Sequence, residues 1–144
     1  MTMTKSARNV RSMMDERRIK SMITDWAKSI ERQDRQGVLA GHSSDVVMID
    51  FPNTVRGIDA YAKTWDFFDD SRRGPVTFEP HGIEVTAGDS VAFAFCDIHC
   101  DGTTAGPLDL RLTVGFVKSG HDWIITHEHH SVPTEDDVLI GPDV

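Results

Sequence analysis

The sequence predicts a single α+β domain in which helices come first and antiparallel strands follow. Apolar residues between positions 19 and 30 recur with the three-to-four-residue spacing of an amphipathic helix. From residue 76 onward, short segments rich in β-branched and aromatic residues are separated by hairpin-length turns, which is typical of antiparallel strands. We therefore expect a strongly curved antiparallel sheet with the helices on one face.

Each expected element has a local signal in the chain. Gly37 lies where the first helix ends, and the segment "DVVMIDF", residues 45–51, has the β-branched composition of a strand. Asp59 is a suitable residue to begin a third helix. The expected order is a helix ending near Gly37, a short helix before His42, a strand over 45–51, a helix from Asp59 to Phe68, and strands over 76–79, 83–87, 91–100, 108–118 and 123–132.

Composition and charge restrict the classes of function. The chain has 144 residues, 39% of them hydrophobic, and a formal net charge of -8, which argues against nucleic acid as the main partner. Residues 1–12 are expected to be a flexible basic leader, residues 13–133 the domain, and residues 134–144 an acidic tail. The sequence contains neither a signal-peptide pattern nor an apolar run of membrane-spanning length, so we expect a cytoplasmic protein that does not bind membranes.

The two cysteines are expected to be free. Cys96 and Cys100 lie four residues apart in a predicted strand, so their Cα atoms would be roughly 13 Å apart, which is too far for a disulfide. Two cysteines also cannot form a disulfide framework or a cysteine zinc site.

The strand over 108–118 has two different faces. Leu108, Leu110, Leu112, Val114 and Phe116 form an apolar face, and the alternate positions mix polar with small residues. One interpretation buries the apolar face under a second subunit and uses the mixed face to line a cavity. The reverse assignment is equally compatible with the alternation.

Three stretches give the chain a resemblance to a known superfamily: "HSSDVVMIDFPNTVRGIDAY", "LRLTVGFVKSGHDW" and "WIITHEHHSVP". On these stretches and the element order, residues 13–133 resemble the nuclear transport factor 2-like superfamily, and within it the SnoaL-like and ketosteroid isomerase-like group. The resemblance implies a cone-shaped, curved antiparallel sheet wrapped around an N-terminal helix layer, in the order α-α-β-α-β-β-β-β. It implies much less about the reaction, because the superfamily contains isomerases, cyclases, dehydratases, hydrolases and binding modules.

The resemblance also suggests roles for two aspartates. Asp50, at the end of the first strand, matches the general base of ketosteroid isomerases, and Asp109 matches their protonated aspartate. Those enzymes place a tyrosine on the first helix, whereas the only tyrosine here is Tyr61 on the third helix, and the first carries Trp26. Steroid isomerisation by that mechanism is therefore not expected. A turn role is the alternative for Asp50, which precedes Pro52.

Histidines are concentrated near the end of the last strand, at positions 127, 129 and 130. His127 and His129 share one face with Trp123, and the resemblance implies that this face points into the cone. The two would then lie roughly 7 Å apart in the pocket and exchange protons near neutral pH, with His130 and Glu128 on the outer face. The alternative is that both histidines only form hydrogen bonds that hold the fold together.

Further residues are expected around the same pocket. Arg111 is expected to steady negative charge, preferably paired with Asp50, and Thr113 to line the cavity beside it. Trp26 and Trp65 are candidates for ligand contacts, although aromatic residues at helical spacing also occur in cores. The full expected set is Asp50, His127, His129 and Arg111 as catalytic residues, and Trp26, Trp65, Asp109, Thr113 and His99 as ligand-binding residues.

Three hypotheses about function remain open on the sequence. The first is a cofactor-independent enzyme of isomerase, cyclase or lyase type that transfers protons on a small apolar carbonyl or carboxylate compound. The second is a non-catalytic ligand-binding or dimerisation module. The third is a metal protein that uses His127 and His129 with His99 or Asp97 and Asp50, although no metal motif is present. In the first two, we expect no cofactor or metal and a homodimer through the outer face of the sheet.

Overall fold

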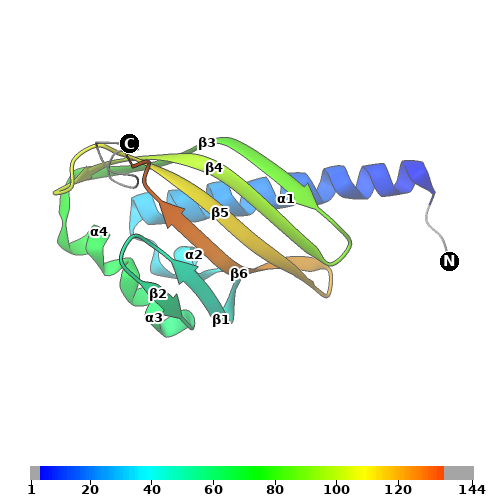
Figure 1. The fold of residues 1–144 in the computed structure, drawn as a ribbon, viewed down its shortest axis with the longest axis horizontal. Helices are drawn as coiled ribbons and strands as arrows, with labels where there is room; N and C mark the ends of the chain where they lie inside the picture. Colours follow the sequence, from blue (N-terminus) through cyan, green and yellow to red (C-terminus); the bar gives the residue numbers. More distant parts are fainter. Residues whose placement is uncertain (1–3, 135–144) are drawn as a thin grey trace, which may run out of the picture.

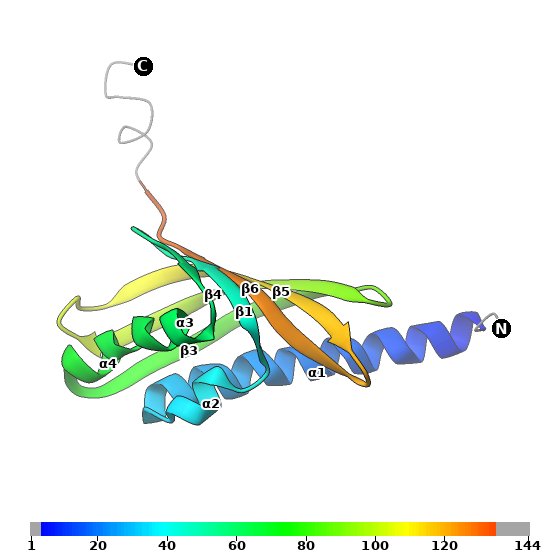
Figure 2. The same cartoon turned by 90° about the horizontal axis from the view of Figure 1, so that it is seen from below.

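The protein is an α+β domain with one long helix lying across a curved, six-stranded sheet, as the sequence predicts (Figures 1 and 2). A computed structural model describes residues 4–134. The elements are α1 (Lys5–Arg32), α2 (Arg35–Leu39), β1 (His42–Ile49), β2 (Thr54–Arg56), α3 (Ile58–Thr64), α4 (Asp66–Asp70), β3 (Arg72–Ala87), β4 (Val91–Thr103), β5 (Leu108–Ser119) and β6 (Asp122–Ser131).

Helix α1 supplies one wall of the core. Its N-cap is Thr4, whose hydroxyl accepts a hydrogen bond from Ala7 N, and its C-cap is Gln33 in the left-handed conformation. The residues of the predicted apolar stripe are all buried against the sheet: Ile19, Met22, Ile23, Trp26, Ala27 and Ile30. The N-terminal part of the helix extends beyond the sheet (Figure 2). Residues 5–12, expected as a flexible leader, form the first turns of this helix.

The predicted third helix is two short helices that meet at Trp65. Helix α3 ends and α4 begins at this residue, which is buried, as is Tyr61 on α3. Arg35 of α2 links α3 and α4 to the rest of the helix layer. Its guanidinium donates to the carbonyl of Ala62 on α3 and forms an ion pair with Asp66 on α4.

The strand order in the sheet is β2-β1-β6-β5-β4-β3. Neighbouring strands are antiparallel except for β1 and β6, which pair in parallel. The sheet is therefore not entirely antiparallel, contrary to the expectation from the sequence. Strand β6, the last in the chain, returns to lie beside β1, the first, and runs in the same direction. The two segments 76–79 and 83–87, predicted as separate strands, belong to the single long strand β3.

The apolar face of β5 points toward α1. Leu110, Leu112, Val114 and Phe116 are buried in the core, whereas the mixed face is turned outward. The interpretation that placed the apolar face under a second subunit is therefore wrong, and the reverse assignment holds. Cys96 and Cys100 also point into the core as free thiols, and burial raises their pKa values to about 12 and about 11.

A β-bulge in β6 decides which histidines face the core. Gly115 of β5 pairs with His127, but the next residue, Phe116, pairs with Ile125, so Thr126 is an extra residue without a partner on β5. Because the side-chain period of a strand is two, one extra residue exchanges the two faces of everything that follows it. Trp123 and Ile125 are buried before the bulge, and Glu128 and His130 are buried after it.

No helix in residues 4–134 has the length and hydropathy needed to cross a membrane. The expected acidic tail, residues 134–144, lies outside the described residues except for Thr134, as do residues 1–3 of the expected leader. The cytoplasmic location and the absence of nucleic-acid partners stay predictions.

Candidate functional site

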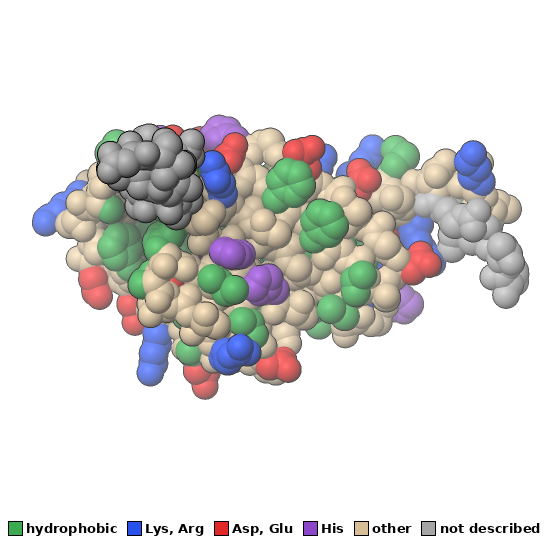
Figure 3. Space-filling model, in the orientation of Figure 1, with side chains coloured by type: hydrophobic (Ala, Val, Ile, Leu, Met, Phe, Trp, Pro, Cys, Tyr) green, Lys and Arg blue, Asp and Glu red, His purple; other side chains and the backbone are tan. Residues whose placement is uncertain are grey.

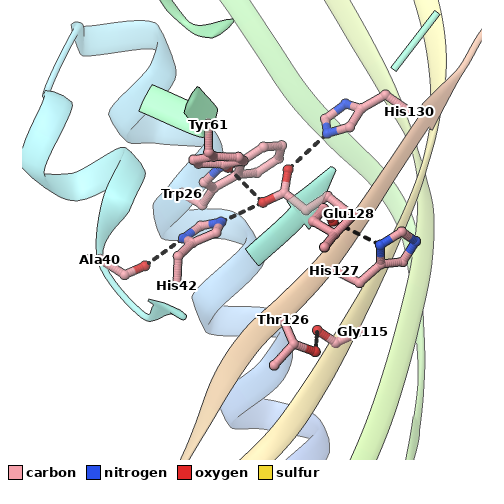
Figure 4. Close-up of polar contacts among 10 residues, drawn as sticks. Trp26, Ala40, His42, Tyr61, Gly115, Thr126, His127, Glu128 and His130 are labelled. Carbon is pink, nitrogen blue, oxygen red and sulfur yellow. Dashed lines mark hydrogen bonds and ion pairs between the residues drawn. The ribbon is translucent and has the colours of Figure 1, made fainter. Parts of the chain in front are cut away.

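The most unusual group in the interior is the carboxylate of Glu128, which is only 1% exposed. Three donors from three parts of the chain surround it (Figure 4). Its Oε2 atom accepts from His42 Nε2 at 2.5 Å and from the Tyr61 hydroxyl at 2.6 Å. Its Oε1 atom faces His130 Nε2 at 2.9 Å. We call His42, Tyr61, Glu128 and His130 the Glu128 cluster.

A second set of contacts fixes the donors of the Glu128 cluster. Trp26 Nε1 on α1 donates to the Tyr61 hydroxyl at 3.0 Å, so that hydroxyl has its own proton available for Glu128. The Nδ1 atom of His42 lies 3.1 Å from the carbonyl oxygen of Ala40. The rings of His42 and Tyr61 also pack against each other, with centroids 4.6 Å apart and an angle of 34° between their planes. The cluster thereby connects β1, α3 and β6, and Trp26 links it to α1.

Electrostatics keeps Glu128 ionised and Tyr61 protonated. Burial by itself favours the neutral form of Glu128, but hydrogen bonds from His130 and His42 outweigh it and lower the pKa of this carboxyl to about 2. Burial, together with the negative charge of Glu128, raises the pKa of Tyr61 well above its usual value. The tyrosine therefore remains a donor to the carboxylate at neutral pH.

A cavity of about 440 Å³ opens beside the Glu128 cluster. Its wall is mainly aromatic and aliphatic, and polar side chains enter it at a few points. The aromatic residues are Phe51, Trp65, Phe67, Phe68 and Phe78, and the polar ones are Asp50, Thr64, Thr103 and His130. A concave, apolar space with a few polar groups is the usual form of a small-molecule site.

His130 joins the cluster to the cavity. It lines the cavity wall and is 5% exposed, while its Nε2 atom is occupied by Glu128. Within residues 4–134, its Nδ1 atom has no hydrogen-bond partner, so this is the ring nitrogen available to a molecule in the cavity. A carboxylate that holds one nitrogen of an imidazole fixes the tautomer and increases the basicity of the other nitrogen.

Asp50 lies at the edge of the same cavity, as the resemblance implied. One of its carboxylate oxygens accepts a hydrogen bond from Asn53 N at 2.8 Å, and its own backbone N–H donates to the Asn53 carbonyl. Asp50 therefore has the turn role that was its alternative and a place at the cavity as well.

His127 and His129 do not reach the cavity, contrary to their expected placement. Both follow the bulge at Thr126, which turns them to the outer face of the sheet. His127 Nδ1 lies 2.8 Å from the carbonyl oxygen of Val47, and the two imidazole rings are 6.4 Å apart. His129 is exposed.

The expected group on β5 and β4 also lies on the outer face. Arg111 and Thr113 are exposed, because the mixed face of β5 points away from α1. Arg111 stands opposite Asp97 on the neighbouring strand rather than beside Asp50. His99 and Asp109 form an exposed ion pair with 2.9 Å between His99 Nδ1 and the carboxylate, which raises the pKa of His99. None of these four residues lines the cavity.

The two tryptophans have different positions. Trp65 lines the cavity, and its indole N–H is buried without a hydrogen-bond partner within the described residues. Trp26 lies behind it, in contact with Trp65, Phe78 and the Tyr61 hydroxyl, and is part of the core rather than the cavity wall.

The residues suggested for a metal site do not come together. Asp50 is at the cavity, whereas His127, His129, His99 and Asp97 are on the opposite face of the sheet or turned away from it. Among residues 4–134, no group of three His, Cys, Asp or Glu side chains is close enough to hold a metal ion.

Sequence reasoning missed His42, Tyr61, Glu128 and His130 as site residues. Two of them were assigned to the wrong face of β6, because the bulge leaves no mark in the alternation of residues. The single tyrosine on the third helix was a usable signal, since a buried tyrosine needs a hydrogen-bond partner. Glu128, the only acidic residue of the last strand after the tryptophan, was the available acceptor.

Comparisons with known proteins agree with this fold. The model of the SnoaL-like domain family matches residues 19–135. No protein with a curated description matches the chain. An NTF2-like protein of unknown function from Pseudomonas putida KT2440 is 27% identical, with a TM-score of 0.79 over 88% of this chain and 92% of that one.

Two more distant solved structures share the fold. A candidate dehydratase of the NTF2-like family from Streptomyces avermitilis has 13% identity and a TM-score of 0.72, covering 85% of this chain and 99% of that one. A candidate ketosteroid isomerase from Shewanella frigidimarina has 18% identity and a TM-score of 0.66, covering 77% and 92%. The class defined by the fold is thus the NTF2-like proteins. Within this class, the chain belongs to the SnoaL-like domain family.

We predict that replacing Glu128 by Gln removes one component of the pH dependence of stability. The folded-state pKa of Glu128, about 2, is below its ordinary value of 4.5, so its stabilising effect is complete above about pH 5 and disappears as the pH falls toward 2. This component corresponds to about 3 kcal/mol. Denaturant unfolding of wild type and Glu128→Gln across this pH range measures it.

Glu79→Gln is the matched control, because Glu79 is an exposed glutamate whose side chain is 60% accessible. We expect Glu128→Gln to lower the free energy of unfolding at neutral pH by about 3 kcal/mol or more, since a buried cluster loses its only anion. A stability equal to that of Glu79→Gln at neutral pH would contradict the role given to Glu128.

Proposed function

We propose that this protein is a cofactor-independent enzyme that transfers protons on a small, apolar carbonyl compound bound in the cavity. The proposal rests on the position of His130. This residue lines an apolar cavity, and the buried carboxylate of Glu128 holds its Nε2 atom. The two distant structures with this fold, described as a candidate dehydratase and a candidate ketosteroid isomerase, are consistent with such chemistry.

In this proposal His130 is the general base. Its Nδ1 atom takes a proton from the carbon next to the substrate carbonyl, and the electron pair of the broken C–H bond moves into an enolate. The imidazolium then returns the proton to the same carbon or to another carbon of the conjugated system. Glu128 stabilises the imidazolium through the bond between Oε1 and Nε2.

The cavity favours a neutral substrate. Among residues 4–134, those that line it include no Lys or Arg, and their ionisable side chains are Asp50, His130 and the buried thiol of Cys100. A substrate carboxylate would therefore lose its hydration without finding a cation, which is costly in an apolar site. A neutral carbonyl compound fits better than the carboxylate that the sequence left open.

Trp65 and Asp50 take the remaining roles in the proposal. The ring of Trp65 lines the cavity and offers an aromatic surface against which the substrate can pack. Asp50 sits at the edge of the cavity, where it can exchange protons with a second position of the substrate.

The alternative function is a ligand-binding module without catalysis. One observation favours it: the Glu128 cluster connects three elements of the fold, and Trp26 adds a fourth, as a purely structural network would. The two functions differ in whether His130 changes the rate of proton transfer, and not in whether its replacement affects stability.

We predict that the protein accelerates deuterium exchange at the activated CH₂ group of 2-tetralone, a bicyclic aromatic ketone used as a probe. His130→Gln should slow the catalysed exchange by about 10²-fold or more, the usual contribution of a general base. Exchange in D₂O is followed by proton NMR of the ketone, with the uncatalysed rate subtracted.

His129→Gln is the matched control, because it alters the neighbouring histidine on the outer face of the same strand. Its exchange rate should equal that of wild type. Binding of 2-tetralone without acceleration would favour the binding module, and a loss of rate in His129→Gln but not in His130→Gln would overturn the assignment of the base.

We also propose that the protein forms a homodimer through the outer face of the sheet. Val91, Phe93 and Phe95 of β4 and Val117 of β5 are exposed there by 40% to 61%, and β4 and β5 are adjacent. We call these four residues the outer patch. Hydrophobic and histidine side chains lie close together on the face that is turned away from α1 (Figure 3).

A second copy of the chain suits this face. It carries charges of both signs, with Asp97 and Arg111 opposite each other on adjacent strands, so a two-fold axis can bring unlike charges of two copies together. The apolar face of β5, which first suggested the dimer, is buried inside one subunit. The outer patch is now the observation that supports the dimer.

We predict that wild type is a dimer at micromolar concentration and that Phe93→Glu shifts it to the monomer, because the substitution buries a charge in the interface. Val10→Glu is the control, since Val10 is an equally exposed apolar residue on α1, 56% accessible. Light scattering measures the mass. A monomeric wild type, or equal behaviour of the two variants, would contradict the proposal.

A further inference from the structure

His42 is the one histidine whose two ring nitrogens both face acceptors at close range. Nδ1 lies 3.1 Å from the Ala40 carbonyl oxygen, and Nε2 lies 2.5 Å from Glu128 Oε2. A carbonyl oxygen only accepts, so Nδ1 must carry a proton. Whether the ring is neutral or positively charged therefore depends on which group holds the one proton between Nε2 and the carboxylate.

That proton belongs to the imidazole. The carboxylate already accepts from Tyr61 and from His130, and a carboxylate that receives several hydrogen bonds is a poor proton acceptor. An imidazole is in addition intrinsically the stronger base of the two groups. With protons on both nitrogens, His42 carries a positive charge.

The surroundings of His42 are suited to a buried cation. Its side chain is 0% exposed, so an unbalanced charge of either sign here would be costly. From β6 it faces the Glu128 carboxylate, from α3 the ring of Tyr61 at 4.6 Å between centroids, and from the end of α2 the carbonyl of Ala40. An anion, an aromatic face and the carbonyl at the C-terminal end of a helix all favour positive charge.

The charge on His42 determines the state of His130. Glu128 also holds His130 Nε2, so the two histidines share one negative charge. Without a positive His42, that charge would promote protonation of His130, and Nδ1 would lose its lone pair. When His42 is positive, it forms with Glu128 an ion pair that has no net charge. The carboxylate then favours protonation of His130 less strongly.

We propose that His42 is a positioning residue that stays protonated as an imidazolium, balances the charge of Glu128 and thereby keeps His130 a neutral base with its free Nδ1 at the cavity. The role for His130 rests on the proposed function. The protonation state of His42 does not, because it follows from the geometry of the Glu128 cluster alone.

The direct test is an NMR spectrum that correlates the ring nitrogens and carbon-bound protons of the histidines in ¹⁵N-labelled wild type at neutral pH. We expect both nitrogens of His42 to be protonated, and His130 to be protonated at Nε2 only. His127 is the internal reference, because its Nδ1 faces the Val47 carbonyl and its ring should be the neutral Nδ1–H tautomer. The signals of His42 are identified in the wild-type protein by nuclear Overhauser effects to the ring of Tyr61, the single tyrosine, whose centroid lies 4.6 Å away.

An unprotonated nitrogen on His42 at neutral pH would overturn the proposal, and the wild-type spectrum alone decides this if His42→Gln fails to fold. Where the variant folds, its glutamine keeps one donor for Glu128 but no charge. We then expect His130 to become doubly protonated at neutral pH, and the pH profile of 2-tetralone exchange to move up by about one pH unit or more. His99→Gln, which removes an exposed histidine, should leave both unchanged.

The two proposals can fail separately. If His42 is doubly protonated but His130→Gln exchanges 2-tetralone as fast as wild type, proton transfer by His130 is wrong and the charge assignment stands. If His42 is neutral while His130→Gln still loses activity, the base is correct and the role of His42 is wrong.

Discussion

The structure depends on one buried carboxylate. Glu128 is almost completely removed from solvent, and its charge is tolerated because His42, Tyr61 and His130 all direct donors at it. These residues belong to β1, α3 and β6, so the hydrogen bond from Tyr61 also ties α3 to the sheet, and the one from His42 ties β1 to β6. An isolated carboxylate here would be protonated. Because donors surround it, Glu128 stays ionised and holds His130 in place at the cavity wall.

The cavity lies where the fold cannot fill itself. Helix α1 covers one part of the sheet, and the short helices α3 and α4 cover another (Figure 2). A cavity of about 440 Å³ remains, lined mainly by aromatic side chains. His130 is the residue that belongs both to this space and to the Glu128 cluster. A rigid network behind a single basic nitrogen is the arrangement that general base catalysis requires, because the base is held in one tautomer before a substrate arrives.

The sequence predicts much of the fold and little of the site. The amphipathic spacing of α1 and the long alternating strands are local patterns, and the helix layer, the sheet and the family were predictable from them. The site depends on the bulge at Thr126, which moves His130 and Glu128 inward and His127 and His129 outward. A bulge depends on how two neighbouring strands pair, so it cannot be predicted from the alternation of residues along one strand. Arg111 and Thr113 were misplaced for the related reason that alternation gives two faces without saying which is inside.

We infer that His130, and not the other two histidines of β6, contacts a molecule bound in the cavity. Nuclear Overhauser effects between bound 2-tetralone and the histidine ring protons test this most directly, because they require proximity and no catalysis. We expect contacts from the ketone to the ring of His130 and to the aromatic side chain of Trp65, with none to His127 or His129. Contacts to His127 or His129 without any to His130 would contradict it.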